Sequence, residues 1–311
     1  NARTTQGIRY GAGIRYSNAP EPTWHGHNGV LQFIFDADRR RDWPPMQALP
    51  FAILAIVCYL AAGSWQALAL ARRVAPRAAL VRSLGLLAVS AHAVVVAHSV
   101  FLGHGLHLGL FESASLFSWL IAALLIAVSL LKPLLSVGAG LFPLAALTLI
   151  ALMLFPSHMV EANVSPGIVF HILTSSVASA LLSIAAVQAM LVALQNHALK
   201  RRHTRGIVQV LPARTSMERL LFELIGAGLL LLTAAIVSGF IFIDNLFAQH
   251  LVHKTVFSLA AWMVFTGLLI GRHWLGWRGA RAVRWTLGGC LLLVLGYFGT
   301  KVALQLVFHD V

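Results

Sequence analysis

Cysteine is scarce in this chain. Only two cysteines occur among 311 residues, Cys58 and Cys290, and each lies inside an apolar segment. No C-x-x-C or C-x-x-C-H motif is present, which argues against zinc-finger chemistry, thiol exchange and covalent attachment of haem to this chain. The glycines at Gly271 and Gly276 have no strand before them and do not form a phosphate loop. These absences favour a function other than catalysis.

Charge is also scarce, and long apolar runs take its place. Charged residues make up 11% of the chain, whereas 59% of the residues are hydrophobic and the mean hydropathy is +0.81. A soluble core could not keep so much apolar surface from water. The runs are about 20 residues long and lack the alternation of outer-membrane strands. We predict an all-α polytopic membrane protein, a bundle of eight transmembrane helices at about 47–70, 80–101, 112–131, 135–155, 167–195, 218–243, 254–272 and 284–307.

The first 45 residues differ from the rest. They are polar, carry Arg3, Arg9, Arg15 and the run Arg39-Arg40-Arg41, and lack the apolar region of a signal peptide. Met46 is the first methionine and directly precedes the first apolar run. We predict two domains: a polar extension at 1–45 that is disordered or not native, and an eight-helix transmembrane domain at 46–311.

The net charge of +13 comes from basic residues in short loops, which form no extended basic face. This pattern predicts no nucleic-acid partner; the predicted partner is the lipid bilayer. Fifteen lysines and arginines fall in the first, third, fifth and seventh connections, whereas the other side holds only Lys254 and Lys301. Because positive residues favour the cytoplasmic side, we predict that both ends of the 46–311 unit are periplasmic.

Histidine is the main candidate functional group, with fourteen copies in an apolar chain. A neutral imidazole can bind iron or another metal and costs less to bury in a bilayer than a charged group. His92 and His98 lie on the second predicted helix, about 600° of rotation apart and hence on different faces. Either could serve a cofactor, but a structural hydrogen bond between helices is an equal alternative for His92.

A second set of histidines is predicted at the outer surface. His171 lies just inside the fifth span, His309 ends the eighth, and His250 and His253 lie three residues apart at the outer mouth of the hairpin between the sixth and seventh spans. Together they form an imidazole cluster that suits a planar ligand or a metal held between helices. The alternative is that they are ordinary interfacial histidines.

Four stretches of the sequence resemble one known family in order and spacing. They are Leu108 to Trp119, similar to the family segment N-L-Y-E-S-L-x-F-L-S-W; Pro166 to His171; Leu211-Pro212 with Met217 to Leu220; and Lys254 to Trp262 followed by Gly276-Trp277-Arg278-Gly279 and Tyr297-Phe298-Gly299. The family is that of the CcsA-like cytochrome c assembly proteins, in particular its shorter bacterial inner-membrane branch of the YpjD and HemX type. The resemblance covers nearly all of 46–311.

The resemblance implies haem as cofactor, held beside an outer motif W-G-x-x-W-x-W-D and presented to an apocytochrome c. In this chain the matching stretch, residues 240–250, is apolar and contains no tryptophan. The resemblance implies His171 and His309 as iron ligands on opposite sides of the haem. It also implies a location in the bacterial inner membrane. Further expected cofactor-binding residues are His92, His98, His253, Phe242 and Phe247.

Two functions remain open from the sequence. The first is haem binding or handling in cytochrome c biogenesis, with haem and an apocytochrome or another membrane protein as partners. The second is a haem-free accessory or regulatory membrane subunit that supports, for example, divalent-cation transport. The retained histidines favour the first function, and the missing tryptophans favour the second. An autonomous transporter fits less well, because the sequence has neither buried charge nor an inverted repeat.

Overall fold

The computed structural model describes residues 48–100, 106–107, 109–155, 161–162, 165–201, 207–242 and 249–299. The chain divides into two units, Asn1–Asp42 and Trp43–Val311, and every described residue belongs to the second. The predicted extension at 1–45 lies outside the described residues. So do Phe247 and His309, whereas His250 lies in α9 (Gln249–Trp274).

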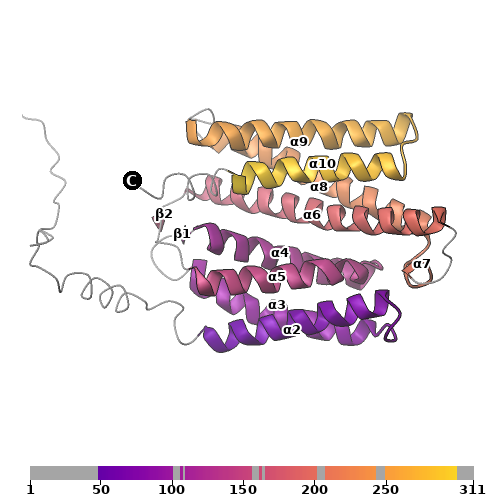
Figure 1. The fold of residues 1–311 in the computed structure, drawn as a ribbon. Helices are drawn as coiled ribbons and strands as arrows, with labels where there is room; N and C mark the ends of the chain where they lie inside the picture. The colour runs from indigo at the N-terminus through magenta and orange to yellow at the C-terminus, as the bar shows by residue number, and fades with distance from the viewer. Residues whose placement is uncertain are drawn as a thin grey trace, which may run out of the picture. The chain divides into compact units, whose positions relative to one another are not determined.

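Within the described residues, eight helical segments are long and apolar enough to cross a membrane, which confirms the predicted all-α polytopic bundle. Figure 1 shows them side by side along one common direction. The long helices are α2 (Leu49–Leu70), α3 (Ala78–Val100), α4 (Leu110–Leu131), α5 (Gly138–Leu154), α6 (Pro166–Lys200), α8 (Arg214–Phe242), α9 (Gln249–Trp274) and α10 (Ala280–Val294). Shorter pieces are the 3-10 turn η1 (Leu135–Val137) before α5, the small helix α7 (Ile207–Val210), and η2 (Leu295–Gly299), a π-helical continuation of α10.

The predicted boundaries hold to within a few residues for most spans, and α6 and α9 depart most. α9 begins at Gln249, five residues before the predicted start at 254. α6 continues to Lys200, five residues past the predicted end at 195. Hydropathy marks where the apolar stretch ends, but Ala198, Leu199 and Lys200 favour a helix and no glycine or proline follows 195 within it, so the backbone continues. The last span starts at Ala280 instead of 284, and its predicted end at 307 lies outside the described residues.

A tight turn connects α9 to α10. α9 ends at Trp274 and α10 begins at Ala280. Gly276 and Gly279 adopt φ values of +64° and +58°, in the left-handed region that glycine tolerates best. These two glycines therefore allow the chain to reverse within a few residues.

The helices form two groups that meet through α4 and α6. α2 packs against α3 and α5, and α4 packs against α3 and α5. In the second group α6 contacts α8 most extensively, and α10 contacts both α9 and α6 (Figure 1). Contacts between α4 and α6 join the groups.

The basic connections gather at one end of the bundle, here called the basic end. The Lys132 ammonium lies 2.9 Å from the Glu223 carboxylate on α8, and Arg72 donates a hydrogen bond to Gln209 of α7. Exposed ion pairs contribute little to stability, so these contacts matter here as markers of position. The grouping predicted from the charges is thus reproduced in space.

The opposite end, here called the distal end, carries a small element that the sequence did not predict. Strand β1 (Leu106–His107) pairs with β2 (Glu161–Ala162) in antiparallel fashion, with Leu106 opposite Ala162. Figure 1 places both strands at the end away from α7. The pairing joins the connection that follows α3 to the one that follows α5.

Small residues allow α8 to approach α6 closely. Gly228 of α8 faces Leu182 of α6, and a Cβ at Gly228 would lie 2.7 Å from both Cγ and Cδ2 of Leu182. Helices in a bilayer associate mainly by close packing of this kind, because lipid tails are as apolar as the side chains. Gly226 lies two residues away, and a Cβ added there would meet no neighbouring residue within 4 Å.

We expect reporter fusions to distinguish the two ends of the bundle. A reporter fused at Arg202, in the connection between α6 and α7, should behave as cytoplasmic, and one at the C-terminus as periplasmic, because the basic end follows the positive-inside rule. Paired phosphatase and fluorescent-protein fusions measure this directly. The reverse pattern would overturn the predicted orientation.

We also expect a sharp contrast between two glycines of α8. Gly228→Ala should lower the free energy of unfolding by about 1–3 kcal/mol, because the new methyl group overlaps Leu182. Gly226→Ala should be neutral or stabilise by up to about 1 kcal/mol, because alanine favours a helix and meets nothing. Thermal unfolding midpoints in the same detergent compare the two variants. Equal changes in both would show that the α6–α8 contact is looser than described.

Candidate functional site

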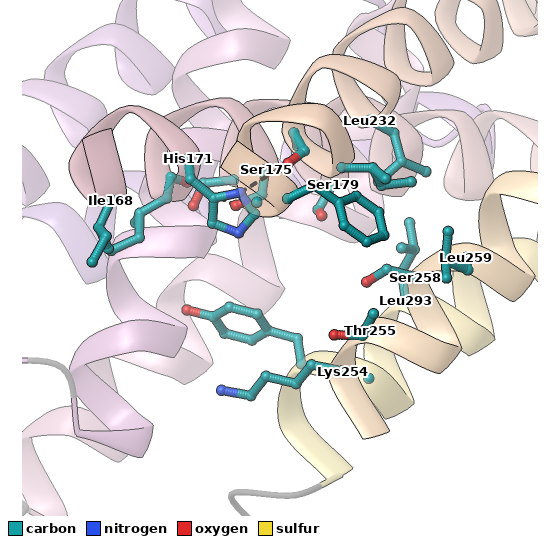
Figure 2. A pocket seen from close by; sticks show the side chains of 18 of the residues that line it. Ile168, His171, Ser175, Ser179, Leu232, Lys254, Thr255, Ser258, Leu259 and Leu293 are labelled. Atoms are coloured by element: carbon teal, nitrogen blue, oxygen red, sulfur yellow. Dashed lines mark hydrogen bonds between the residues drawn. The ribbon is translucent and has the colours of Figure 1, made fainter. Parts of the chain in front are cut away.

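A cavity of about 400 Å³ opens between α6, α8, α9, α10 and η2 (Figure 2). Its volume lies within the range of roughly 300–1,000 Å³ typical of small-molecule sites. Most of its lining is apolar, with Ile168, Leu232, Leu259 and Leu293 among the side chains that face it. Phe117 of α4 also lines it, so both helix groups contribute to the walls.

His171 is the predicted iron ligand that the fold brings to this cavity. It lies five residues after the first residue of α6, and its Nδ1 is 2.9 Å from the carbonyl oxygen of Ala235 and 3.2 Å from Oγ of Ser238, both on α8. A carbonyl oxygen can only accept a hydrogen bond, so Nδ1 must carry the proton and donate. The lone pair of the ring then lies on Nε2.

The free ring nitrogen points into the cavity. Figure 2 shows one nitrogen of His171 directed towards α8 and the other towards the open space between the helices. Histidines that bind metals commonly donate their other ring N–H to a backbone carbonyl, which fixes both the tautomer and the ring orientation. His171 has this arrangement through Ala235.

Gly239 makes room for the imidazole. A Cβ at this position would lie 3.0 Å from Cε1 and 3.3 Å from Nδ1 of His171. Any larger residue would press on the ring and shift it away from the Ala235 carbonyl. The sequence Ser238-Gly239 therefore supplies both a hydrogen-bond partner and the space for the histidine.

Polar groups are set into the apolar wall. Ser175, Ser176 and Ser179 of α6 line the cavity, and so do Thr255 and Ser258 of α9. The Ser175 hydroxyl donates to the Ile172 carbonyl at 3.0 Å, which leaves its oxygen able to accept. The cavity can therefore hold a mainly apolar ligand with a few polar groups.

The structure places His92 in a different environment. It is fully buried on α3, with Nδ1 3.3 Å from the Tyr59 hydroxyl of α2 and Nε2 2.9 Å from Oγ of Ser115 on α4. Both ring nitrogens are thus engaged in hydrogen bonds between helices, as the structural alternative requires. His92 does not line the cavity that contains His171.

The other predicted residues are not brought to the cavity either. His98 is half-buried on α3, His253 is exposed on α9, and neither lines the cavity. Phe242 packs on Gly167 at the start of α6, where an added Cβ would lie 2.4 Å from its ring, and Phe240 lines the cavity in its place. As cofactor-binding residues these stay predictions, together with His309 and Phe247, which lie outside the described residues.

Sequence reasoning missed several lining residues, namely Lys254, Tyr297 and the hydroxyl groups of α6 and α9. A signal for the hydroxyls was present. Ser175 and Ser179 are four residues apart, and Thr255 and Ser258 are three apart, so each pair shares one helix face within an apolar span. Lys254 was assigned only to topology, and its direction into the cavity depends on how α9 is rotated.

Comparison with known proteins supports one family. The family model described as cytochrome C assembly protein matches residues 79–308. The inner membrane protein YpjD of Escherichia coli K12 is 34% identical over 150 residues, which are 48% of this chain and 57% of YpjD. An uncharacterized 28.8 kDa protein of Azospirillum brasilense is 35% identical over 150 residues, which are 47% of this chain and 55% of that protein.

These alignments span about half the length of the curated relatives. No solved structure matches the chain. The family model, in contrast, covers most of the chain, from the second residue of α3 through α10. The chain therefore belongs to the cytochrome c assembly protein family.

Proposed function

We propose that this membrane protein binds haem in the cavity between α6, α8, α9 and α10, with Nε2 of His171 as a ligand of the haem iron. The observation that carries the proposal is the hydrogen bond from His171 Nδ1 to the Ala235 carbonyl, which leaves Nε2 unprotonated and directed into the cavity. In the cell, the protein would hold haem during cytochrome c assembly.

A single imidazole is enough for haem but not for a bare metal ion. Among the described residues, no group of three or more histidine, cysteine, aspartate or glutamate side chains could hold a metal ion. Haem brings four porphyrin nitrogens to its own iron, so the protein needs to supply only axial ligands. The apolar walls around His171 also suit the porphyrin ring, which a bare ion would not need.

The role proposed for the chain is binding and handling, without bond-making residues of its own. His309 is proposed as the second axial ligand on the strength of the family resemblance, and His92, His98, His253, Phe242 and Phe247 as residues that support the bound cofactor. The partner that receives the haem is an apocytochrome or another membrane protein. The proposed location is the bacterial inner membrane, which the named inner-membrane relative supports. The proposed orientation, with the distal end and both ends of the 46–311 unit periplasmic, rests on the distribution of lysine and arginine.

A second candidate function is that of a haem-free accessory or regulatory subunit, for example one that supports divalent-cation transport. The observation that favours it is the composition of residues 240–250, where the family resemblance leads one to expect a tryptophan-rich motif and this chain has none. In that case the cavity would hold a lipid tail or another apolar ligand. The absence of haem from protein purified under haem-replete conditions would favour this function.

We expect His171→Ala to abolish or strongly shift the Soret band of protein purified after haem-replete expression, because it removes an axial ligand. His197→Ala is the matched control. It changes an exposed histidine of the same helix near the basic end and should leave the spectrum unchanged. The measurement is the absorbance spectrum together with haem extraction from equal amounts of protein.

Loss of haem through misfolding must be separated from loss of the ligand. Added imidazole should restore the spectrum of His171→Ala, because the small molecule can enter the space that the side chain leaves. If His171→Ala keeps the wild-type spectrum, the ligand assignment is wrong. If wild-type protein has neither a Soret band nor extractable haem, the accessory function replaces the proposal.

A further inference from the structure

Lys254 is the only positively charged side chain that lines the cavity in the described part of the chain. It is half-buried on α9, next to the lining residue Thr255. Among the described residues that line the cavity, none is an aspartate or a glutamate. In the described residues, the ion pairs between side chains involve Lys132, Arg214 and Arg219, all near the basic end.

The position of Lys254 is unusual for a lysine near a membrane boundary. A lysine at the end of a span usually extends into water beside the lipid headgroups. Here the exposed neighbour is His253, whereas Lys254 faces the cavity. Charged side chains within a membrane protein are costly and commonly face a ligand or a water-filled cavity.

Lys254 and His171 stand at similar depths on opposite walls. Each lies five residues after the first residue of its helix, α9 for Lys254 and α6 for His171, and a rise of about 1.5 Å per residue puts each about 7–8 Å in. Figure 2 shows the two side chains on different sides of the cavity, with another ring side chain between them in this view. The apolar residues Leu232 and Leu293 complete the walls on α8 and α10.

We infer that Lys254 binds a carboxylate of the ligand and so sets the orientation of the ligand in the cavity. The inference rests on the proposed haem function and adds to it that the group recognised is a haem propionate. An ammonium partly removed from water forms a strong, charge-assisted hydrogen bond with a carboxylate. With the iron at His171 and a propionate at Lys254, two fixed points would define how the porphyrin lies.

The decisive probes are porphyrins that differ only in the carboxylate or in the metal. Haem and haem dimethyl ester are each titrated into the full chain in detergent, and binding is followed by the Soret band. For each variant we take the ratio of haem affinity to ester affinity. This ratio should be about tenfold or more higher in wild-type protein than in Lys254→Gln. The ratio between variants cancels the different partitioning of the two porphyrins into detergent.

Three variants complete the test. Lys254→Arg keeps the charge and should retain most of the preference for haem. Lys132→Gln removes a lysine at the basic end and should behave as wild type. Iron-free protoporphyrin keeps both propionates but has no iron for His171 to ligate. Its binding, measured by porphyrin fluorescence, should therefore weaken in Lys254→Gln and stay unchanged in His171→Ala.

The possible failures are distinguishable. If wild type and Lys254→Gln show the same ratio of haem to ester affinity, Lys254 does not bind a carboxylate, even though haem binding at His171 stands. If wild type binds haem, ester and iron-free porphyrin equally well and His171→Ala changes none of them, both the carboxylate contact and the iron ligand are overturned. If no porphyrin binds, the proposed function fails and the inference fails with it.

Discussion

Close packing of α6 against α8 is the contact on which the candidate site depends. Gly228 lets the two backbones approach, since any side chain there would overlap Leu182. Further along the same pair, the approach brings the Ala235 carbonyl within 2.9 Å of His171 Nδ1. A wider gap would break this hydrogen bond and free the imidazole to rotate. The tautomer and direction of the one cavity histidine thus follow from a steric property of a helix pair.

The two helix groups use histidine in opposite ways. His92 has hydrogen-bond partners for both nitrogens, Tyr59 and Ser115, and so ties α2, α3 and α4 together within a fully buried site. Within the described residues His171 has partners for one nitrogen only, and the other faces the cavity. An unpaired buried polar group is costly, so the first arrangement stabilises the bundle while the second leaves a group whose partner must come from a ligand or water.

Membership of the cytochrome c assembly family is the reason to consider haem as the ligand of this cavity. The stretch where the family resemblance leads one to expect tryptophans is apolar here, so a bound porphyrin would depend more on the walls of the cavity than on stacked indoles. The walls come from four helices of the second group and from Phe117 of α4. Specificity would then rest on a few polar points, chiefly His171 and Lys254, in a largely apolar space.

The sequence by itself determined the class of protein, the eight spans and the sorting of basic residues to one end, because hydropathy and charge act over whole segments and do not depend on which helix meets which. It also singled out His171. Only the tertiary structure decided that His92 is enclosed by Tyr59 and Ser115, that Phe240 rather than Phe242 lines the cavity, and that Lys254 points inward. These outcomes depend on how each helix is rotated about its axis, and in a span that is apolar on all sides the sequence carries little record of that rotation.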